Sequence, residues 1–207
     1  MYGNFKIKYQ SELEKLPYFT KQTAGMLMEK EGVNLDRKIE RLTAAEYYLR
    51  LKKGLYTTRP YVLSCNNQEQ YAASLVPVLC VPAYLSLEYV LSSEGLIPEA
   101  IRSYTAITTK STRTFTNFLG RFDYKNINER LFFGFQNARA TKVKALFDLL
   151  YLKSNLGTNV KKELSDGLRI NWANVSARDL LEFDRYVEMS KSGKMAGIGE
   201  ILKGIIK

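Results

Sequence analysis

The stretch "NLDRKIERLTAAEYYLRLKKGLYTT" (residues 34–58) decides how the N-terminal part of the chain folds. Leu35, Ile39 and Leu42 recur at the spacing of one helix face, so the first half of the stretch predicts a helix. "YYLRL" and "LYTT" are short β-prone runs on either side of "KKG", which predicts a hairpin with Gly54 at its turn. A helix that leads into a basic hairpin is the order of elements in a winged helix.

Two further helices are predicted before this stretch. "YQSELEKL" predicts a first helix that ends at Pro17. Thr20 predicts the N-cap of a second helix, "TKQTAGMLMEKEG", which Gly32 is placed to terminate. Asn34 then predicts the N-cap of the third helix. The turn "EGVN" between the second and third helices is short, as helix-turn-helix units require.

The charge of the chain favours an anionic partner. The 207 residues include 31 Lys and Arg against 21 Asp and Glu, for a formal net charge of +10. Nucleic acid is the first class of partner that this predicts, and an acidic protein or membrane surface is the second. Residues 1–62 hold 12 cations and 7 anions, and from residue 34 onward within that segment the balance is 7 to 3. The excess therefore concentrates in the third helix and the hairpin, where neutralising phosphates would release counterions from DNA.

The predicted DNA-binding residues come from three elements. The third helix is expected to face base edges or phosphates, while the start of the second helix and the hairpin hold the backbone. The full set is Lys21, Gln22, Asn34, Arg37, Lys38, Arg41, Arg50, Lys52 and Lys53. Two alternatives stay open. Asp36 and Glu40 could pair with Arg37 and Lys38 on a solvated helix face, and the basic surface could dock an acidic protein without any DNA binding.

The chain as a whole is predicted to be α+β, with a winged helix-turn-helix over residues 1–62 and a mixed α/β domain over residues 63–207. Residues 101–135 are rich in Thr, Phe, Tyr and Ile, which predicts a small antiparallel sheet. Residues 140–155 predict a buried helix, Ser176 with Asp179 predicts a capping box, and the tail after residue 192 predicts a terminal helix.

The predicted sheet interleaves aromatic and basic residues. Such strands can stack single-stranded bases, but the pattern is more typical of the two faces of a half-buried sheet, which is the interpretation we favour. The aromatic residues are Phe115, Phe118, Phe122, Tyr124, Phe132, Phe133 and Phe135, and the cations between them are Lys110, Arg113, Arg121 and Lys125.

The composition argues against most catalytic chemistry. Histidine is absent, which excludes imidazole bases, histidine metal ligands and Ser-His-Asp machinery. Cys65 and Cys80 are too few for a zinc cluster and are expected to be reduced. We predict no catalytic residue, metal or cofactor, and the least implausible enzyme is a metal-dependent nuclease. The carboxylates considered for such a role are expected to be solvated or capping groups: Asp148, Asp166, Asp179, Glu182 and Asp184.

The location of the protein is predicted from what the sequence lacks. No run approaches the roughly 18 to 20 apolar residues of a membrane span, and the N-terminus has no uninterrupted apolar core of a signal peptide. We therefore expect a cytoplasmic protein without a membrane partner.

Three stretches together resemble the AbiEi-like antitoxins of type IV toxin-antitoxin systems. They are "RLKKGLY" (residues 50–56), "PAYLSLEYVLSSEGLIPEA" (82–100) and "ATKVKALFDLLYL" (140–152), and the resemblance extends over nearly the whole chain. It implies a transcriptional autorepressor that binds inverted repeats in double-stranded DNA at its own promoter. It also implies a C-terminal domain that counteracts a nucleotidyltransferase-like toxin, with or without direct contact.

The third motif departs from the family pattern. Lys142 and Val143 stand where the family usually has Pro and Glu, so any role of that Glu is absent here. Tyr89 also stands where a small residue is usual. We expect the motif positions to serve the fold before function: Tyr84, Ser86, Leu87, Gly95, Leu96, Pro98, Lys144, Ala145 and Asp148.

Overall fold

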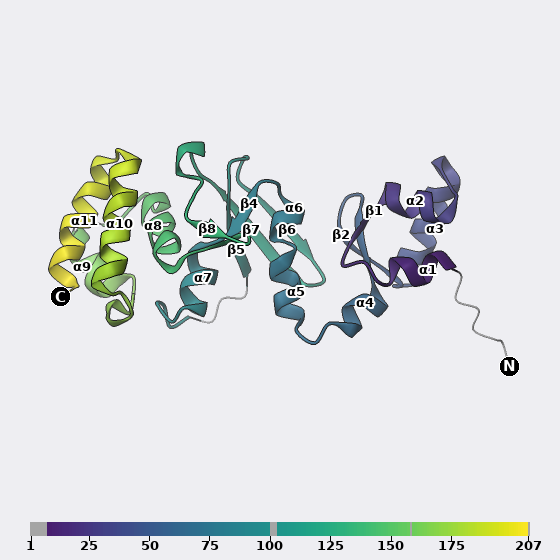
Figure 1. The fold of residues 1–207 in the computed structure, drawn as a ribbon, viewed down its shortest axis with the longest axis horizontal. Coiled ribbons are helices and arrows are strands. Elements are labelled where there is room, and N and C mark those ends of the chain that lie inside the picture. The colour runs from purple at the N-terminus through teal and green to yellow at the C-terminus, as the bar shows by residue number, and fades with distance from the viewer. Residues whose placement is uncertain (1–7, 100–102, 158, 207) are drawn as a thin grey trace. The chain divides into compact units, whose positions relative to one another are not determined.

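The computed structural model describes residues 8–99, 103–157 and 159–206, and it has the predicted α+β class (Figure 1). The chain forms two compact units. One comprises Met1–Ala72 with Phe115–Leu119, and the other comprises Ala73–Thr114 with Gly120–Lys207. The domain boundary predicted after residue 62 falls inside helix α4 (Arg59–Ser64), whereas the units divide after Ala72.

The N-terminal unit combines short helices with a small sheet. Its elements in chain order are α1 (Lys8–Leu13), β1 (Phe19–Thr20), α2 (Lys21–Met28), α3 (Gly32–Ala44), β2 (Tyr48–Lys52), β3 (Leu55–Thr58) and α4, followed by α5 (Gln68–Ser74) at the division between the units. The three strands form an antiparallel sheet in the order β1-β3-β2. The predicted hairpin is therefore present, and β1 adds a strand that the sequence did not indicate.

The hairpin is fixed to the helices by its apolar residues. Gly54 has φ +76° at the turn, a backbone conformation that favours glycine. Leu51 and Leu55 are buried and Tyr56 is half-buried, as expected for residues that anchor the hairpin. The core beneath them consists of Leu13, Phe19, Ala24, Met28, Leu35, Ile39 and Tyr48.

The caps of α2 and α3 are only partly as predicted. Thr20 is the N-cap of α2, and its hydroxyl accepts a hydrogen bond from the Thr23 amide at 3.1 Å. Gly32 does not terminate α2, because Glu29 already does so with φ 52°, and Gly32 instead begins α3. Asn34 is not the N-cap of α3, since that position belongs to Glu31. Both predictions were wrong because the connection between the helices, residues 29–31, is shorter than "EGVN" suggested.

Gly25 has a role that the sequence analysis did not identify. A Cβ atom at this position would lie 2.9 Å from the backbone oxygen of Lys30 and 2.9 Å from a methyl group of Leu35. Gly25 therefore lets α2 approach the turn and the first part of α3 closely. A glycine inside a helix costs stability, and here the close packing explains its presence.

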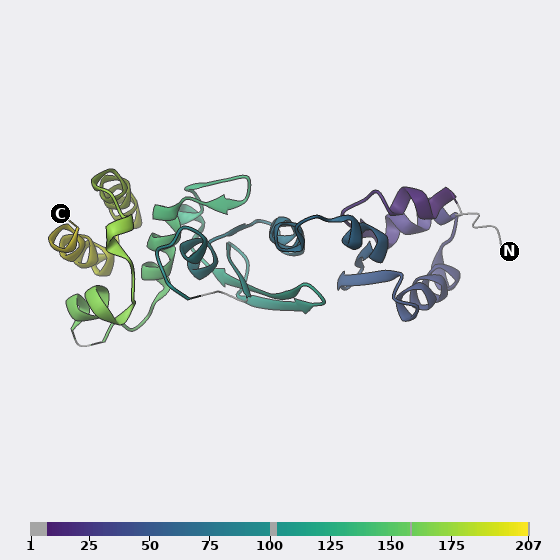
Figure 2. The same ribbon diagram turned by 90° about the horizontal axis from the view of Figure 1, so that it is seen from below.

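The C-terminal unit contains the larger sheet and the longer helices. Its strands are β4 (Ala83–Leu85), β5 (Ser103–Thr108), β7 (Gly120–Asn126), β8 (Phe135–Gln136) and β9 (Arg139–Ala140). β6 (Arg113–Asn117) begins in this unit and continues beyond Thr114, where this segment of the unit ends. Its helices are α6 (Val76–Leu79), α7 (Leu87–Ser93), η1 (Glu129–Leu131), α8 (Lys142–Leu152), α9 (Val160–Lys162), η2 (Glu163–Gly167), η3 (Trp172–Asn174), α10 (Ala177–Ser190) and α11 (Gly193–Ile205). Helices α10 and α11 lie side by side and both pack on α8 (Figures 1 and 2).

The larger sheet is mixed, in contrast to the small antiparallel sheet predicted over residues 101–135. Its strand order is β6-β7-β5-β4-β9-β8. β5 pairs with β7 in parallel and β4 pairs with β9 in parallel, while β4–β5 and β8–β9 are antiparallel. The antiparallel prediction was wrong for this region because β5 pairs with β7 in parallel, so that β7 lies between β5 and β6. "RLFFGFQ" gives only η1 and the short β8, and residues 101 and 102 of the predicted segment lie outside the described residues.

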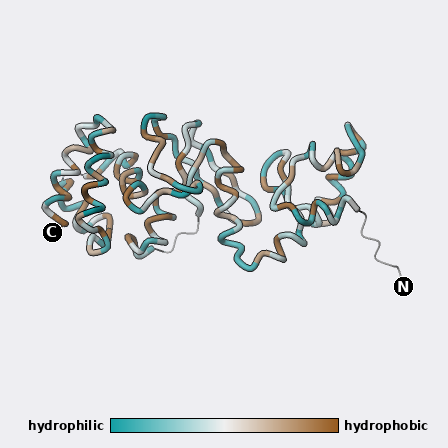
Figure 3. Tube along the Cα trace, in the orientation of Figure 1, coloured by the Kyte–Doolittle hydropathy of each residue, from teal (hydrophilic) through white to brown (hydrophobic). Residues whose placement is uncertain are grey.

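The predicted helices of this unit are confirmed. α8 buries Val143, Leu146, Phe147 and Leu150, and Figure 3 shows hydrophobic residues along this helix. α10 begins with the predicted capping box: the Ser176 hydroxyl accepts from the Asp179 amide at 3.2 Å, and the Asp179 carboxylate accepts from the Ser176 amide at 2.7 Å. The tail forms α11.

Candidate nucleic-acid interface and a buried polar cluster

One face of α3 is open to solvent and carries the predicted recognition residues. They follow one another at i, i+3, i+4 and i+7, the spacing of a single helix face. Leu35 and Ile39, on a different face, are buried against the rest of the unit. The residues on the open face are Asn34, Arg37 and Arg41, which are exposed, and Lys38, which is half-buried.

The cations at the edge of this face have specific neighbours. The Lys38 ammonium lies 6.0 Å from the centroid of the Tyr9 ring, within the range of a cation–π contact. The Lys21 ammonium pairs with Asp36 on α3, and the Lys21 amide donates to the Gly54 carbonyl at 3.0 Å. Lys21 therefore links α2 to α3 and to the hairpin turn, so its charge is already engaged by Asp36.

The hairpin brings a second group of cations to the same unit. β2 packs against α3, so the cations of the hairpin and those of the α3 face belong to one compact body. The register of β2 against β3 shifts between Arg50 and Lys52, which indicates a bulge beside the turn. Arg50, Lys53 and also Gln22 of α2 are exposed, and Lys52 is half-buried.

The C-terminal unit contains a buried polar cluster that the sequence analysis missed. Lys144 and Asp148 have no exposed surface, and their side chains form an ion pair one turn apart on α8. The Asp148 carboxylate also accepts hydrogen bonds from the Tyr84 hydroxyl at 3.0 Å and the Ser86 hydroxyl at 2.7 Å. The expectation that Asp148 is a solvated or capping group was wrong. An i, i+4 Lys–Asp pair looks the same in sequence whether it lies on a surface or in a core.

Aromatic rings surround the Lys144 end of the cluster. Its ammonium lies 4.9 Å from the centroid of Phe133 and 5.0 Å from that of Phe147. Gly134 has φ +74°, and a Cβ atom there would lie 3.0 Å from the Lys144 side chain. The absence of a side chain at Gly134 therefore provides the space in which Lys144 lies.

Burial and pairing act in opposite directions on these two charges. Burial raises the pKa of Asp148, although the charge of Lys144 and the hydroxyl donors Ser86 and Tyr84 oppose that shift. Burial likewise lowers the pKa of Lys144, against the attraction of Asp148. With no solvent-exposed surface on either side chain, the cluster has no access to a substrate, and we assign it to the stability of the unit.

The side chains of Lys142 and Val143 each have a structural role. The Lys142 ammonium lies 2.7 Å from the Asp179 carboxylate and donates to the Asn174 carbonyl at 2.8 Å. Val143 is buried in the core of the unit. The lysine therefore ties the start of α8 to the start of α10, and the valine adds to the packing beneath it.

The remaining predicted carboxylates divide between a cap, a hydrogen bond, an ion pair and solvent. Asp179 is the capping residue that the sequence predicted. Glu182 accepts from Tyr186, Asp184 pairs with Lys203, and Asp166 is exposed. Within residues 8–99, 103–157 and 159–206, no group of three or more His, Cys, Asp or Glu side chains is placed to hold a metal ion. In the same described part of the chain, no helix has the length and apolar character needed to cross a membrane.

No protein-family model, curated protein or solved structure matches this chain. The resemblance to AbiEi-like antitoxins therefore stays a prediction from the three motifs, and the function has to be argued from the geometry of the two units.

Proposed function

We propose that the chain is a double-stranded-DNA-binding autorepressor and antitoxin of a type IV toxin-antitoxin system, acting in the cytoplasm. The N-terminal unit would bind DNA as a winged helix, with α3 in the major groove and the β2–β3 hairpin as the wing. The mechanism is binding alone: cations neutralise phosphates, and a few side chains on α3 contact base edges.

One observation carries the DNA-binding part of the proposal. Asn34, Arg37 and Arg41 lie exposed on a single face of α3, and Arg50 and Lys53 are exposed on the hairpin that packs against that helix. Arginine and asparagine are the side chains that most often pair with guanine and adenine edges in the major groove. The short connection between α2 and α3 fits a helix-turn-helix, in which the second helix of the pair is the reading element.

A titration against the DNA upstream of the gene tests this part. We expect anisotropy or gel-shift measurements to show binding that weakens as salt is added, with the logarithm of the binding constant falling linearly with the logarithm of the salt concentration. This dependence is expected because each phosphate contact releases counterions. A scrambled DNA of equal length and composition is the control, and it should bind more weakly. Absence of salt-sensitive binding, or equal binding to both DNAs, would contradict a sequence-reading repressor.

The antitoxin part rests on the three sequence motifs. It predicts a reading frame for a nucleotidyltransferase-like protein immediately beside the gene. Expression of that neighbour alone should arrest growth, and co-expression of this chain should restore it. A neighbouring frame of another class, or growth arrest that this chain does not relieve, would contradict the antitoxin assignment and leave the DNA-binding part standing.

A protein-docking module is the second candidate, because apolar side chains are exposed beside the α2–α3 turn. Met26 is 75% exposed and Val33 is 63% exposed. Met26 also lines a hollow of about 420 Å³ with Gln22, Glu31 and Leu35. Co-purification with the neighbouring gene product that persists after nuclease treatment and at high salt, together with no binding to the upstream DNA, would favour this candidate.

A further inference from the structure

Helix α10 carries a stripe of exposed side chains opposite the face that it packs against the core. Phe183 and Tyr186 of this helix are buried. Four exposed residues recur at i, i+3, i+7 and i+11, the spacing of one helix face, and this face points away from the buried pair. We call it the α10 stripe, and it consists of Arg178, Leu181, Arg185 and Met189. Leu181 is 65% exposed and Met189 is 52% exposed.

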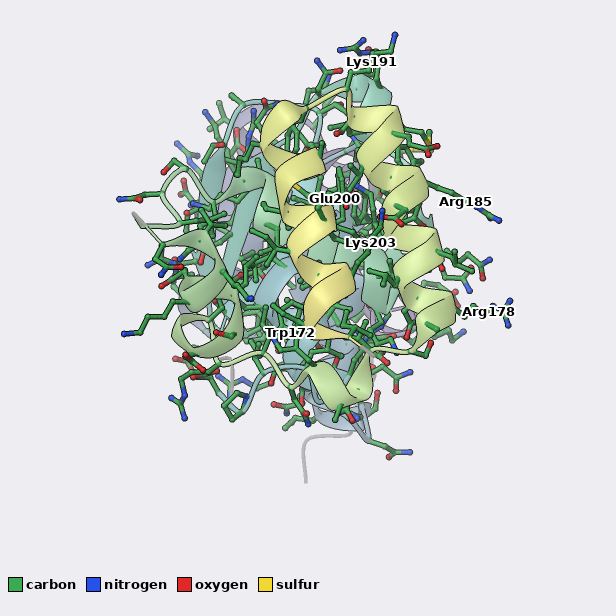
Figure 4. All side chains as sticks on the ribbon, turned by 90° about the vertical axis from the view of Figure 1, so that its left-hand side faces the viewer. Trp172, Arg178, Arg185, Lys191, Glu200 and Lys203 are labelled. Atoms are coloured by element: carbon green, nitrogen blue, oxygen red, sulfur yellow. The ribbon has the colours of Figure 1, made fainter. Side chains whose placement is uncertain are left out.

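The two arginines of the α10 stripe have no carboxylate partner among the described residues. Asp179 and Asp184, which are close to them along the helix, each pair with a lysine of another helix instead. Figure 4 shows Arg178 and Arg185 extending from α10 on the side away from α11. Both guanidinium groups are therefore free to pair with carboxylates of another molecule.

Arg178 stands at a position where a cation does not stabilise its own helix. α10 begins at Ala177, so Arg178 lies in the first turn, where the positive end of the helix dipole disfavours a cation. The last turn of α10, where a cation would be favourable, has no basic residue. A charge that opposes the local preference and has no partner within the described chain is expected where it serves a function.

The order of residues in the α10 stripe defines the chemistry of a partner. Arg178 and Arg185 are seven residues apart, which is about 10 Å along a helix. A second helix lying along α10 would match them with two carboxylates that are two turns apart. Leu181 lies between the arginines, so the same partner helix needs apolar side chains between its carboxylates.

Two other kinds of partner match the α10 stripe less well. The phosphates of a nucleic acid would pair with the arginines but would leave Leu181 and Met189 in water. A second copy of the chain would present a stripe of the same net positive charge, because Glu188 is the one exposed carboxylate on α10. An acidic amphipathic helix complements both the charge and the apolar surface.

We propose that the α10 stripe is a docking surface for an acidic amphipathic helix of a partner protein. Leu181 and Met189 pack against the apolar face of that helix, and Arg178 and Arg185 pair with carboxylates at its edge. The surface lies within the C-terminal unit and uses none of the predicted DNA-binding residues, so the proposal does not depend on DNA binding by the N-terminal unit.

The probe is a fluorescent synthetic peptide, cross-linked to remain helical, with leucines along one face and two glutamates two turns apart beside them. We expect its anisotropy, titrated with the full chain at physiological salt, to show saturable binding. The same peptide with lysines in place of the glutamates should bind at least about tenfold more weakly. Leu181→Ser should weaken binding of the acidic peptide about tenfold, and so should Arg178→Gln with Arg185→Gln. Glu188→Gln should tighten it, because it removes a like charge beside the stripe.

Two control variants separate the α10 stripe from general effects of charge and exposed apolar surface. Lys161→Gln with Lys162→Gln removes two exposed cations of the same unit, and Leu63→Ser removes a leucine of the other unit that is 73% exposed. Neither should change the affinity for the acidic peptide. Unchanged thermal unfolding, followed by the fluorescence of Trp172 in the same unit as α10, confirms that the variants of the stripe are folded.

The proposal is overturned if the acidic peptide does not bind, or if the paired lysine control weakens binding as much as the paired arginine variant. It is also overturned if sedimentation shows a dimer that Leu181→Ser dissociates, because a second copy would then cover the stripe. If DNA upstream of the gene displaces the peptide and itself binds more weakly to the arginine variant, the stripe is a nucleic-acid surface and the proposal is wrong.

Discussion

Lys144 and Asp148 are an ion pair inside the core of the C-terminal unit, with no exposed surface on either side chain. Removing two charges from water is costly, and a buried pair is tolerated only when further hydrogen bonds satisfy it. Tyr84 and Ser86 supply these bonds to the carboxylate. The four side chains therefore behave as one unit, in which the loss of one member leaves the others uncompensated.

Replacing Asp148 by Ala should destabilise the C-terminal unit by about 3–5 kcal/mol, because the Lys144 ammonium would be left buried without a counter-charge. The double variant Lys144→Met with Asp148→Leu should be less destabilised, since it removes both charges. Urea unfolding followed by Trp172 fluorescence measures both, as Trp172 is the single tryptophan of the chain. A double variant that is less stable than Asp148→Ala would show that packing, and not the charge, sets the cost.

Gly25→Ala should destabilise the N-terminal unit by about 1–3 kcal/mol, the usual cost of overpacking. The added methyl group would meet the Lys30 carbonyl, which is backbone and cannot rotate away. Gly197→Ala is the control, since it also lies inside a helix but has open space around it, and it should stabilise the chain by up to about 1 kcal/mol. Hydrogen exchange of the two units separates the effects, and unchanged protection of α2 and α3 in Gly25→Ala would contradict the close packing.

The stability of the C-terminal unit should fall at acid pH through Asp179. Burial alone would raise the pKa of Asp179. The hydrogen bonds from Lys142 and Ser176, together with the charge of Lys142, outweigh the effect of burial and lower this pKa. In the unfolded state the pKa of an Asp side chain is about 3.9. Because the pKa of Asp179 is lower in the folded state, the folded state binds fewer protons than the unfolded state at acid pH. The stabilisation is therefore present above that pH and is lost as the pH falls through the lower pKa of the folded state.

Asp179→Asn should lower the unfolding free energy at neutral pH. The stability that remains should then fall less on acidification than that of the wild type. The measurement is urea unfolding at a series of pH values between neutrality and strong acid, with Asp166→Asn as a control at an exposed carboxylate. An acid dependence that is equal in wild type and Asp179→Asn would contradict the assignment.

The proposed interface predicts two kinds of loss on DNA. Arg37→Ala or Arg41→Ala should change sequence preference at a cost of about 1–3 kcal/mol, while Lys52→Ala with Lys53→Ala should weaken binding to all sequences and flatten the salt dependence. Arg178 and Arg185 project outward from α10 in the other unit (Figure 4). Arg178→Ala with Arg185→Ala is therefore the control, because it removes two positive charges, as Lys52→Ala with Lys53→Ala does. Equal losses in the control would point to net charge as the cause.

Local signals predicted the parts of the fold that depend on neighbouring residues. Thr20 and the Ser176–Asp179 pair cap their helices as expected, because a cap is decided within one turn. The hairpin around Gly54 was predictable for the same reason. The mixed sheet was not, because the parallel pairing of β5 with β7 depends on which distant strand lies next to it.

The candidate sites divide in the same way. The spacing of Leu35 and Ile39 indicated the buried face of α3, since helical periodicity is visible in the sequence. The ion pair between Lys21 and Asp36 and the burial of Asp148 could not be predicted from the sequence, because both depend on how separate elements pack.

The donors to Asp148 also select one register for β4. Tyr84 and Ser86 point to the same side of the chain because they are two residues apart, and both reach the carboxylate. A slip of β4 by one residue would present Ala83 and Leu85 instead, and neither side chain has a donor. Such a misfolded sheet would keep its backbone hydrogen bonds but would leave the carboxylate unsatisfied. The cluster thus increases the free-energy difference between the native register of β4 and a register shifted by one residue, beyond the difference that hydrophobic packing alone would give.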